Sequence, residues 1–199
     1  MLHQLRLFFV AGLTILSLAA CGAASTPPPA DLVTPTAMGN MPGMEHDMSK
    51  MDEAGPYDAL FIDSMIMHHQ GAIDMANQAL EEATKPEIKA LAEAIIKAQE
   101  AEIAQMQEWR KNWYPDLAPT AGMGMDMGTM EVSSDSSKLF DQRFIEAMIP
   151  HHEGAIAMAK DAQQKAEHQE IKTLSEAIIT AQEAEIAQMQ QWLKDWFGQ

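Results

Sequence analysis

Two pairs of adjacent histidines, His68-His69 and His151-His152, are the side chains of this sequence best suited to chemistry. The first pair lies in a run whose apolar residues recur at steps of three and four, the spacing of one face of a helix. One stripe of that face is Phe61, Met65, His68, Ala72, Met75 and Ala79, and the stripe beside it is Ile62, Ile66, His69, Ile73 and Ala76. Both imidazoles are therefore predicted to lie on a face that the helix buries.

The helix predicted over residues 86–114 carries an amide and a carboxylate, Gln99 and Glu102, on its own apolar stripe. Buried polar groups are costly unless they are paired. A turn near residues 84–85 sets the first histidine pair level with Gln99 and Glu102, which predicts that these groups meet. The equivalent residues in the second half of the chain are His151, His152, Gln182 and Glu185.

Imidazole and thioether donors together suit copper as Cu(I) or Cu(II), and a carboxylate adds capacity for the divalent ion. Methionines flank both histidine pairs, so we predict a copper site in each half of the chain. The predicted ligands are His68, His69, Gln99, Glu102, Met65, Met75, Met106, His151, His152, Gln182, Glu185, Met148, Met158 and Met189. The alternative is a metal-free core in which His–Glu and His–Gln hydrogen bonds fix the helix register and methionine fills gaps.

Methionine, at 17 residues, is also abundant in polar segments where no core needs filling. Its M-x-x-M and M-x-M spacings there let neighbouring thioethers close around one soft ion, such as Cu(I) or Ag(I). The predicted weaker, exchangeable ligands are Met38, Met41, Met44, His46, Met48, Met51, Met123, Met125, Met127 and Met130. A biased, oxidisable low-complexity sequence is the alternative.

The chain contains an internal repeat that must position these residues. Residues 61–114 align without a gap with residues 144–197, and roughly two positions in three are identical. Helices are predicted over 57–83, 86–114, 138–165 and 169–196. The predicted fold class is an all-α four-helix bundle over 57–197, made of two duplicated helical hairpins, 57–114 and 138–197, joined by a methionine-rich linker, 115–137.

Residues 1–20 are typical of a secretory signal, with an apolar run too short for a comfortable membrane span. The signal ends in Leu18-Ala19-Ala20-Cys21, which resembles the lipobox of bacterial lipoproteins and predicts lipidation of Cys21. An ordinary cleavage site with an incidental cysteine is the alternative. Residues 21–56 are predicted to be a Pro- and Met-rich linker. The protein is therefore expected outside the cytoplasm, anchored by lipid on the periplasmic or cell-surface side of a bacterial membrane.

The composition limits the partners and the source of stability. A net charge of −16 at pH 7 repels nucleic acid and anionic lipid and attracts cations. A single cysteine cannot form an intramolecular disulfide, so stability must come from packing. A metal ion is the expected partner, nucleic acid is not, and the sequence identifies no protein partner.

Together these motifs resemble those of a bacterial family, the "domain of unknown function 305" proteins. The signature F-x-x-x-M-I-x-H-H-x-x-A-x-x-M, followed on the next helix by Q-x-x-E-I-x-x-M-x-x-W, occurs twice, starting at Phe61 and Gln99 and at Phe144 and Gln182. The resemblance implies a ferritin-like four-helix bundle, and some members are similar to periplasmic copper-tolerance proteins. Pro150 departs from the first copy and is predicted to kink its helix.

Three functions fit this sequence. The favoured one is copper binding, as a scavenger or carrier that supports copper tolerance, without enzymatic activity. A ferritin-like metal oxidase is less well supported, because a di-iron site needs Glu-x-x-His on two helices and Met65 and Met148 stand where these glutamates would be. The third is a metal-free structural or interaction module.

Overall fold

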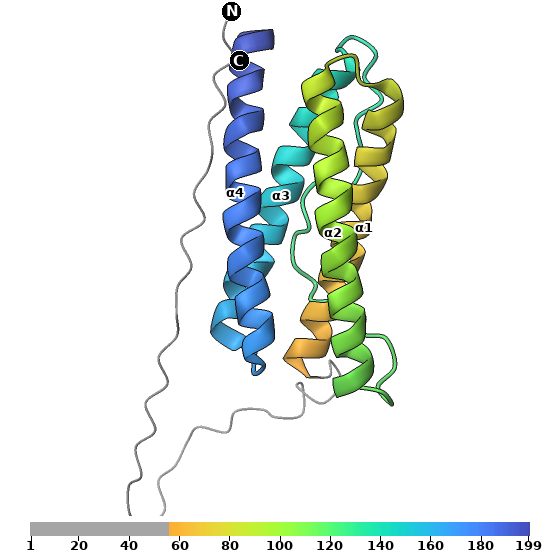
Figure 1. The fold of residues 1–199 in the computed structure, drawn as a ribbon, viewed down its shortest axis with the longest axis vertical. Helices are drawn as coiled ribbons and strands as arrows, with labels where there is room; N and C mark the ends of the chain where they lie inside the picture. Colours follow the sequence, from red (N-terminus) through yellow and green to blue (C-terminus); the bar gives the residue numbers. More distant parts are fainter. Residues whose placement is uncertain (1–55) are drawn as a thin grey trace, which may run out of the picture. The chain divides into compact units, whose positions relative to one another are not determined.

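The structure, a computed structural model, describes residues 56–199, which form four helices and no strand (Figure 1). The helices are α1 (Tyr57–Glu82), α2 (Pro86–Trp113), α3 (Phe140–Lys165) and α4 (Gln169–Phe197). Their ends lie within two residues of the predicted ones. The predicted all-α four-helix bundle made of two duplicated hairpins is confirmed. None of these helices has the length and apolarity needed to cross a bilayer.

The predictions for the N-terminal part of the chain lie outside the described residues. They concern the signal at 1–20, lipidation of Cys21, most of the linker at 21–56, and the candidate ligands Met38, Met41, Met44, His46, Met48 and Met51.

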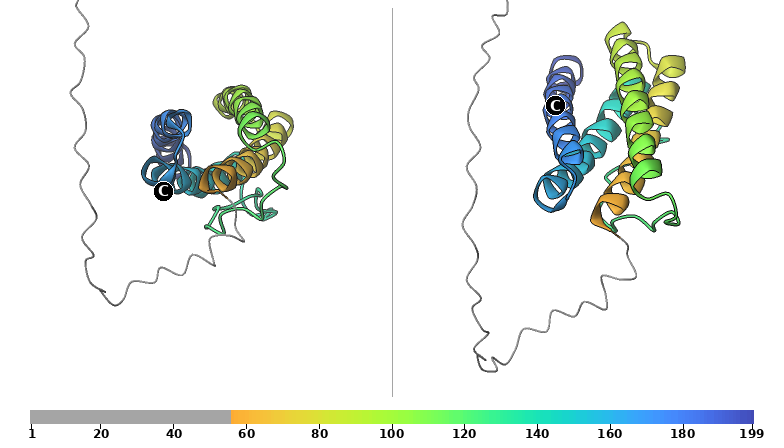
Figure 2. Two further views of the ribbon diagram at one scale, coloured as in Figure 1. Left: turned by 90° about the horizontal axis from the view of Figure 1, so that it is seen from below. Right: turned by 60° about the horizontal axis from the view of Figure 1, so that its bottom comes forward.

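The two hairpins meet through their first helices. α1 packs against α2, α3 against α4, and α1 against α3, with α2 and α4 on the same side of the α1–α3 pair (Figure 2). The start of α1 lies beside the α3–α4 turn and the start of α3 beside the α1–α2 turn, so α1 and α3 are antiparallel. This arrangement relates the two copies of the repeat by an approximate two-fold axis. α3 continues through Pro150 as one helix.

The apolar core consists of two clusters, one towards each end of the bundle. The first includes Met75 of α1, Ile88 of α2, Phe144 and Met148 of α3, and Met189 of α4. The second is its counterpart and includes Phe61, Met65, Met106, Met158 and Ile171. The histidine pairs belong to neither cluster, so they lie in a polar layer between two apolar ones.

Two buried aspartates join the hairpins at the ends of this core. The carboxylate of Asp141 accepts the backbone N–H groups of Thr84 and Lys85, at 3.1 and 2.8 Å, and the Thr84 hydroxyl at 2.8 Å. Asp58 accepts the backbone N–H groups of Glu167 and His168 at 3.0 and 2.9 Å. Burial opposes ionisation of Asp141, but these donors outweigh it and lower the pKa of the carboxyl. The first helix of each hairpin thus supplies hydrogen-bond acceptors for the backbone N–H groups in the turn of the other hairpin.

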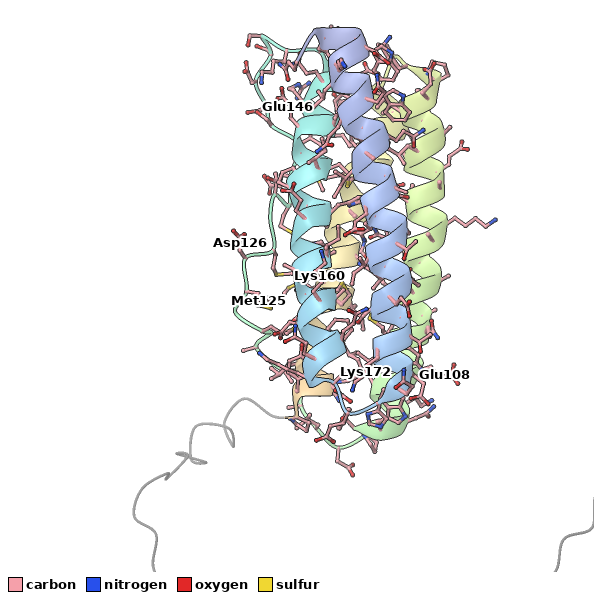
Figure 3. All side chains as sticks on the ribbon, turned by 90° about the vertical axis from the view of Figure 1, so that its left-hand side faces the viewer. Glu108, Met125, Asp126, Glu146, Lys160 and Lys172 are labelled. Carbon is pink, nitrogen blue, oxygen red and sulfur yellow. The ribbon has the colours of Figure 1, made fainter. Side chains whose placement is uncertain are left out.

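The linker 115–137 is packed against the bundle, on the side of α1 and α3 that faces away from α2 and α4 (Figure 2). Arg110 donates to the Leu117 and Ala118 carbonyls near its start, at 3.1 and 2.9 Å, and the Met123 N–H donates to Ser64 Oγ at 2.8 Å. Met125 and Asp126 lie on the linker at the edge of α3 (Figure 3). All four linker methionines, Met123, Met125, Met127 and Met130, are half-buried. The expectation that these methionines have no core to fill was therefore wrong, because the linker covers an apolar helix face.

Asp141→Asn removes the negative charge of the carboxylate that accepts hydrogen bonds from the α1–α2 turn. We expect the free energy of unfolding to fall by about 1.5–3 kcal/mol, the usual contribution of hydrogen bonds to a charged group. Urea denaturation followed by circular dichroism measures the change. Asp74→Asn is the matched control, because the Asp74 carboxylate accepts only the exposed Gln70 amide in this structure. Equal stability of the two variants would contradict the role assigned to Asp141.

Candidate metal centre

The four histidines of the two pairs have no exposed surface. They lie on the buried faces of α1 and α3, which confirms the predicted inward orientation of the imidazoles. A buried imidazole is costly unless its nitrogens are paired or bind a ligand. The partner of each ring nitrogen therefore decides what this layer can do.

The second histidine of each pair meets a glutamate of its own hairpin, as the helix register predicts. Nε2 of His69 lies 2.6 Å from Glu102 Oε2, and Nε2 of His152 lies 2.7 Å from Glu185 Oε2. Both glutamate side chains are 22% exposed, so each pair joins a fully buried ring to solvent. This hydrogen bond leaves Nδ1 of each imidazole without a partner.

The first histidine of each pair turns towards the other hairpin. The ring centroids of His68 and His151 are 3.8 Å apart, whereas those of His68 and His69 are 6.4 Å apart. Adjacent residues of a helix point about 100° apart, so only one of the two can face α2 while the other faces α3. The layer expected within each hairpin is therefore divided into two peripheral His–Glu pairs and one central His–His pair shared by both hairpins.

Unpaired polar atoms are concentrated at this central pair. Neither ring nitrogen of His151 has a hydrogen-bond partner among the described residues, and His68 has one only at Nε2, which lies 3.0 Å from the Met127 carbonyl oxygen. Gln99 and Gln182 are also buried with unpaired amide oxygens, so they do not form the His–Gln hydrogen bonds of a metal-free core. Buried polar groups without protein partners are rare, so these atoms are expected to meet a water molecule or a bound ligand.

Burial keeps both central imidazoles neutral. Loss of hydration and the neighbouring histidine His69 lower the pKa of His68 to about 4. Loss of hydration and, next, the charge of His68 lower the pKa of His151 to about 2. A neutral imidazole keeps one nitrogen lone pair free, so these rings are in the form that binds metal ions.

The predicted methionine ligands lie on both sides of this layer. Met65, Met106 and Met158 belong to one apolar cluster, Met75, Met148 and Met189 to the other, and all six are buried. Within residues 56–199, no three His, Cys, Asp or Glu side chains come together as metal ligands do. The positions that a di-iron site would fill with carboxylates hold Met65 and Met148, so the residues present do not fit that centre. A site in this layer needs sulfur as well as nitrogen donors.

The linker passes close to the histidines, which the sequence did not indicate. Met123 and Met125 pack against the cluster that contains Met65. The Met127 carbonyl reaches His68, and the Met130 side chain lies against Gly71 of α1, next to the histidine pair. Gly71 and Gly154 lie at equivalent positions of the two repeats, beside the buried stripes, and this pairing is the one signal in the sequence that could have located the linker.

Shallow hollows lie between α2 and α4. One hollow, of about 380 Å³, is lined by Leu91, Trp192 and Glu185, among others. Another, of about 450 Å³, lies between Trp109 of α2 and Leu174 of α4. Glu185 lines the first hollow and is hydrogen-bonded to the buried imidazole of His152, so this glutamate connects the hollow to the histidine layer.

Comparison with known proteins identifies the family. The sequence model of the family described as "Domain of unknown function (DUF305)" matches residues 21–110 and, again, 58–193. A structure of CopM in the Cu(I)-bound form is 40% identical with a TM-score of 0.62, and covers 72% of this chain and 99% of that one. CopM in the Cu(II)-bound form is 41% identical with a TM-score of 0.61, and covers 70% and 98%. A putative secreted DUF305 protein from Streptomyces coelicolor is 27% identical with a TM-score of 0.61, and covers 70% and 93%.

No curated protein sequence matches the chain. The family match nevertheless spans both hairpins, and it agrees with the resemblance predicted from the repeated histidine and Gln–Glu motifs. The chain therefore belongs to the DUF305 family.

Proposed function

We propose that this protein binds copper outside the cytoplasm and sequesters or delivers it in copper tolerance. The observation that carries the proposal is the central pair, His68 and His151, whose neutral imidazoles are buried between apolar clusters and lack most of their hydrogen-bond partners. CopM, similar to this chain over most of its length, has been solved with Cu(I), Cu(II) and Ag bound. Imidazole and thioether are the donors available here, and together they suit copper better than the other common cellular metals.

The surrounding residues supply what a copper carrier needs. The acidic surface raises the local concentration of cations. The exposed edges of Glu102 and Glu185 offer a first contact next to His69 and His152, and carboxylates suit the divalent ion. Deeper in, the surroundings become apolar and rich in thioethers, which favours Cu(I). The methionines of residues 38–51 would add weaker, exchangeable sites.

The rival functions have less support. A ferritin-like oxidase would need a donor set that positions 65 and 148 do not provide. A metal-free module accounts for the His–Glu hydrogen bonds, but it would also need His–Gln hydrogen bonds, and the amide oxygens of Gln99 and Gln182 are unpaired. Both rivals explain the packing of the helices, but neither explains the unpaired nitrogens of His151.

Replacing both central histidines, His68→Gln with His151→Gln, removes the two buried donors while leaving polar side chains in the layer. We expect the affinity for Cu(I) to fall by at least about tenfold, or about 1.4 kcal/mol. Competition with a chromogenic Cu(I) chelator measures it, and circular dichroism checks the helix content.

His168→Gln is the control for this measurement, because His168 stacks on Trp113 at the end of the bundle, 3.7 Å between ring centroids. Copper affinity and stoichiometry that are the same in the wild type, the double variant and the control would contradict the assignment of the ligands.

The neutral imidazoles also predict how the stability of the metal-free protein depends on pH. Below about pH 6.5 the unfolded chain protonates these histidines, whereas folded His68 takes a proton only near pH 4. The stabilisation is therefore complete above pH 6.5 and declines as the pH falls towards 4, by up to about 1.4 kcal/mol per pH unit for each histidine. Urea denaturation of chelator-treated protein between pH 7 and 4 measures the slope. The His68→Gln/His151→Gln variant should show a shallower slope, and equal slopes would show that these rings are not buried neutral.

Lipid anchoring through Cys21 remains part of the proposal. If Cys21 carries the anchor, Cys21→Ser releases the protein from the membrane fraction of the cells that express it, because one cysteine supplies the only attachment point. Fractionation followed by immunoblotting compares this variant with the wild type. Retention of Cys21→Ser in the membrane fraction would contradict the lipobox interpretation.

A further inference from the structure

The linker lies directly on α1 and α3 because three glycines, Gly71, Gly128 and Gly154, leave room for it. A Cβ atom on Gly154 of α3 would come within 2.7 Å of the carbonyl carbon and oxygen of Met127. Gly128 of the linker has φ +68°, and a Cβ atom there would clash with the Pro150 carbonyl oxygen. A positive φ favours glycine, so the glycine at position 128 allows the linker to cross α3 at this point. The linker is therefore held against α3 at the level of His151.

This contact brings a backbone acceptor to the central histidines. The Met127 carbonyl oxygen lies 3.0 Å from His68 Nε2, which assigns the ring proton to that nitrogen. His151, the counterpart of His68 in the repeat, has no such acceptor, and its Nε2 is left unpaired. The linker thus breaks the two-fold symmetry of the site, because it occupies Nε2 of His68 and leaves Nε2 of His151 free.

The thioether of Met130 fills the space next to that free nitrogen. The third glycine, Gly71 of α1, has no side chain, and the Met130 methyl group lies 2.5 Å from where its Cβ atom would be. The same point lies 3.3 Å from Met130 Sδ and 3.3 Å from His151 Nε2. A sulfur atom from the linker and an unpaired nitrogen from α3 therefore border one small space on the surface of α1.

We propose that Met130 Sδ and His151 Nε2 bind a single soft monovalent ion, Cu(I) or Ag(I), beside Gly71, with the Met130 methyl group turned aside. The inference rests on the proposed function and refines it: Met130 is an ordered ligand of the buried site, not one of several equivalent exchangeable methionines. One thioether and one neutral imidazole are both donors that Cu(I) accepts. The linker then forms the outer wall of the site, and metal binding ties it to α1 and α3.

Packing alone does not account for this arrangement. A methionine over a helix glycine is an ordinary way to fill a gap. It gives no partner to His151 Nε2, which is fully buried and would remain unsatisfied. An ion between the sulfur and the nitrogen satisfies both. The two explanations differ in the effect that Met130→Leu would have on copper affinity.

The test compares Met130→Leu with Met67→Leu in the full-length chain. Leucine keeps the apolar volume and removes the sulfur, so both variants are expected to fold. Met67 lies on α1, is 51% exposed and belongs to none of the assigned copper sites, so its variant controls for the loss of a thioether. With Cu(I) and a chromogenic competitor, Met130→Leu should weaken the tightest site by at least about tenfold, equivalent to about 1.4 kcal/mol. Met67→Leu should change it less than about twofold.

X-ray absorption at one equivalent of Cu(I) provides a second readout. Copper–sulfur scattering should be present in the wild type and Met67→Leu, and reduced in Met130→Leu. Gly71→Ala should reproduce the loss, because its methyl group would displace the Met130 side chain.

The outcomes distinguish failure of the proposed copper binding from failure of the Met130 assignment. If the wild type binds no Cu(I), the proposed function fails. If the wild type binds Cu(I) and the two leucine variants are equal in affinity and scattering, copper binding stands and the assignment of Met130 is overturned.

Discussion

The structure depends on the antiparallel contact of α1 with α3, which sets His68 against His151 in the middle of the bundle. The contact is closed at both ends by Asp58 and Asp141, each of which accepts hydrogen bonds from the turn of the other hairpin. Apolar clusters on either side exclude water from the histidines. The hairpins therefore cannot move apart without exposing core residues, and the central imidazoles cannot be hydrated without the same cost.

This constraint explains why the chemistry of the layer is divided. At its edges, His69 and His152 remain linked to solvent through partly exposed glutamates. At its centre, His68 and His151 are neutral and lack protein partners for most of their nitrogens. The donors thus change from carboxylate and imidazole at the surface to imidazole and thioether inside, which matches the preferences of Cu(II) and Cu(I) respectively. The proposed copper function follows from this gradient.

Periodicity predicted the helices and their buried faces, because a single pattern recurs twice and each copy has clear ends. The His69–Glu102 pair was also within reach of the sequence, since register along a hairpin follows from the position of its turn. The pairing of His68 with His151 was not, because it depends on how two hairpins dock. The role of the linker was missed for a similar reason. Alternating methionines in a Gly-rich segment look unstructured until Gly71, Gly128 and Gly154 are seen to form one path across the helices.

The central claim is that the buried imidazoles of His68 and His151 bind a soft metal ion, and nitrogen NMR of ¹⁵N-histidine-labelled protein tests it most directly. Titration with Ag(I), a redox-inert substitute for Cu(I), to one equivalent should shift the ring nitrogen signals of the central pair, with the largest change at His151 Nε2. It should leave His168 unchanged. Central-pair signals that stay in place while the protein takes up one equivalent of Ag(I) would contradict the account and move the metal to donors elsewhere in the chain.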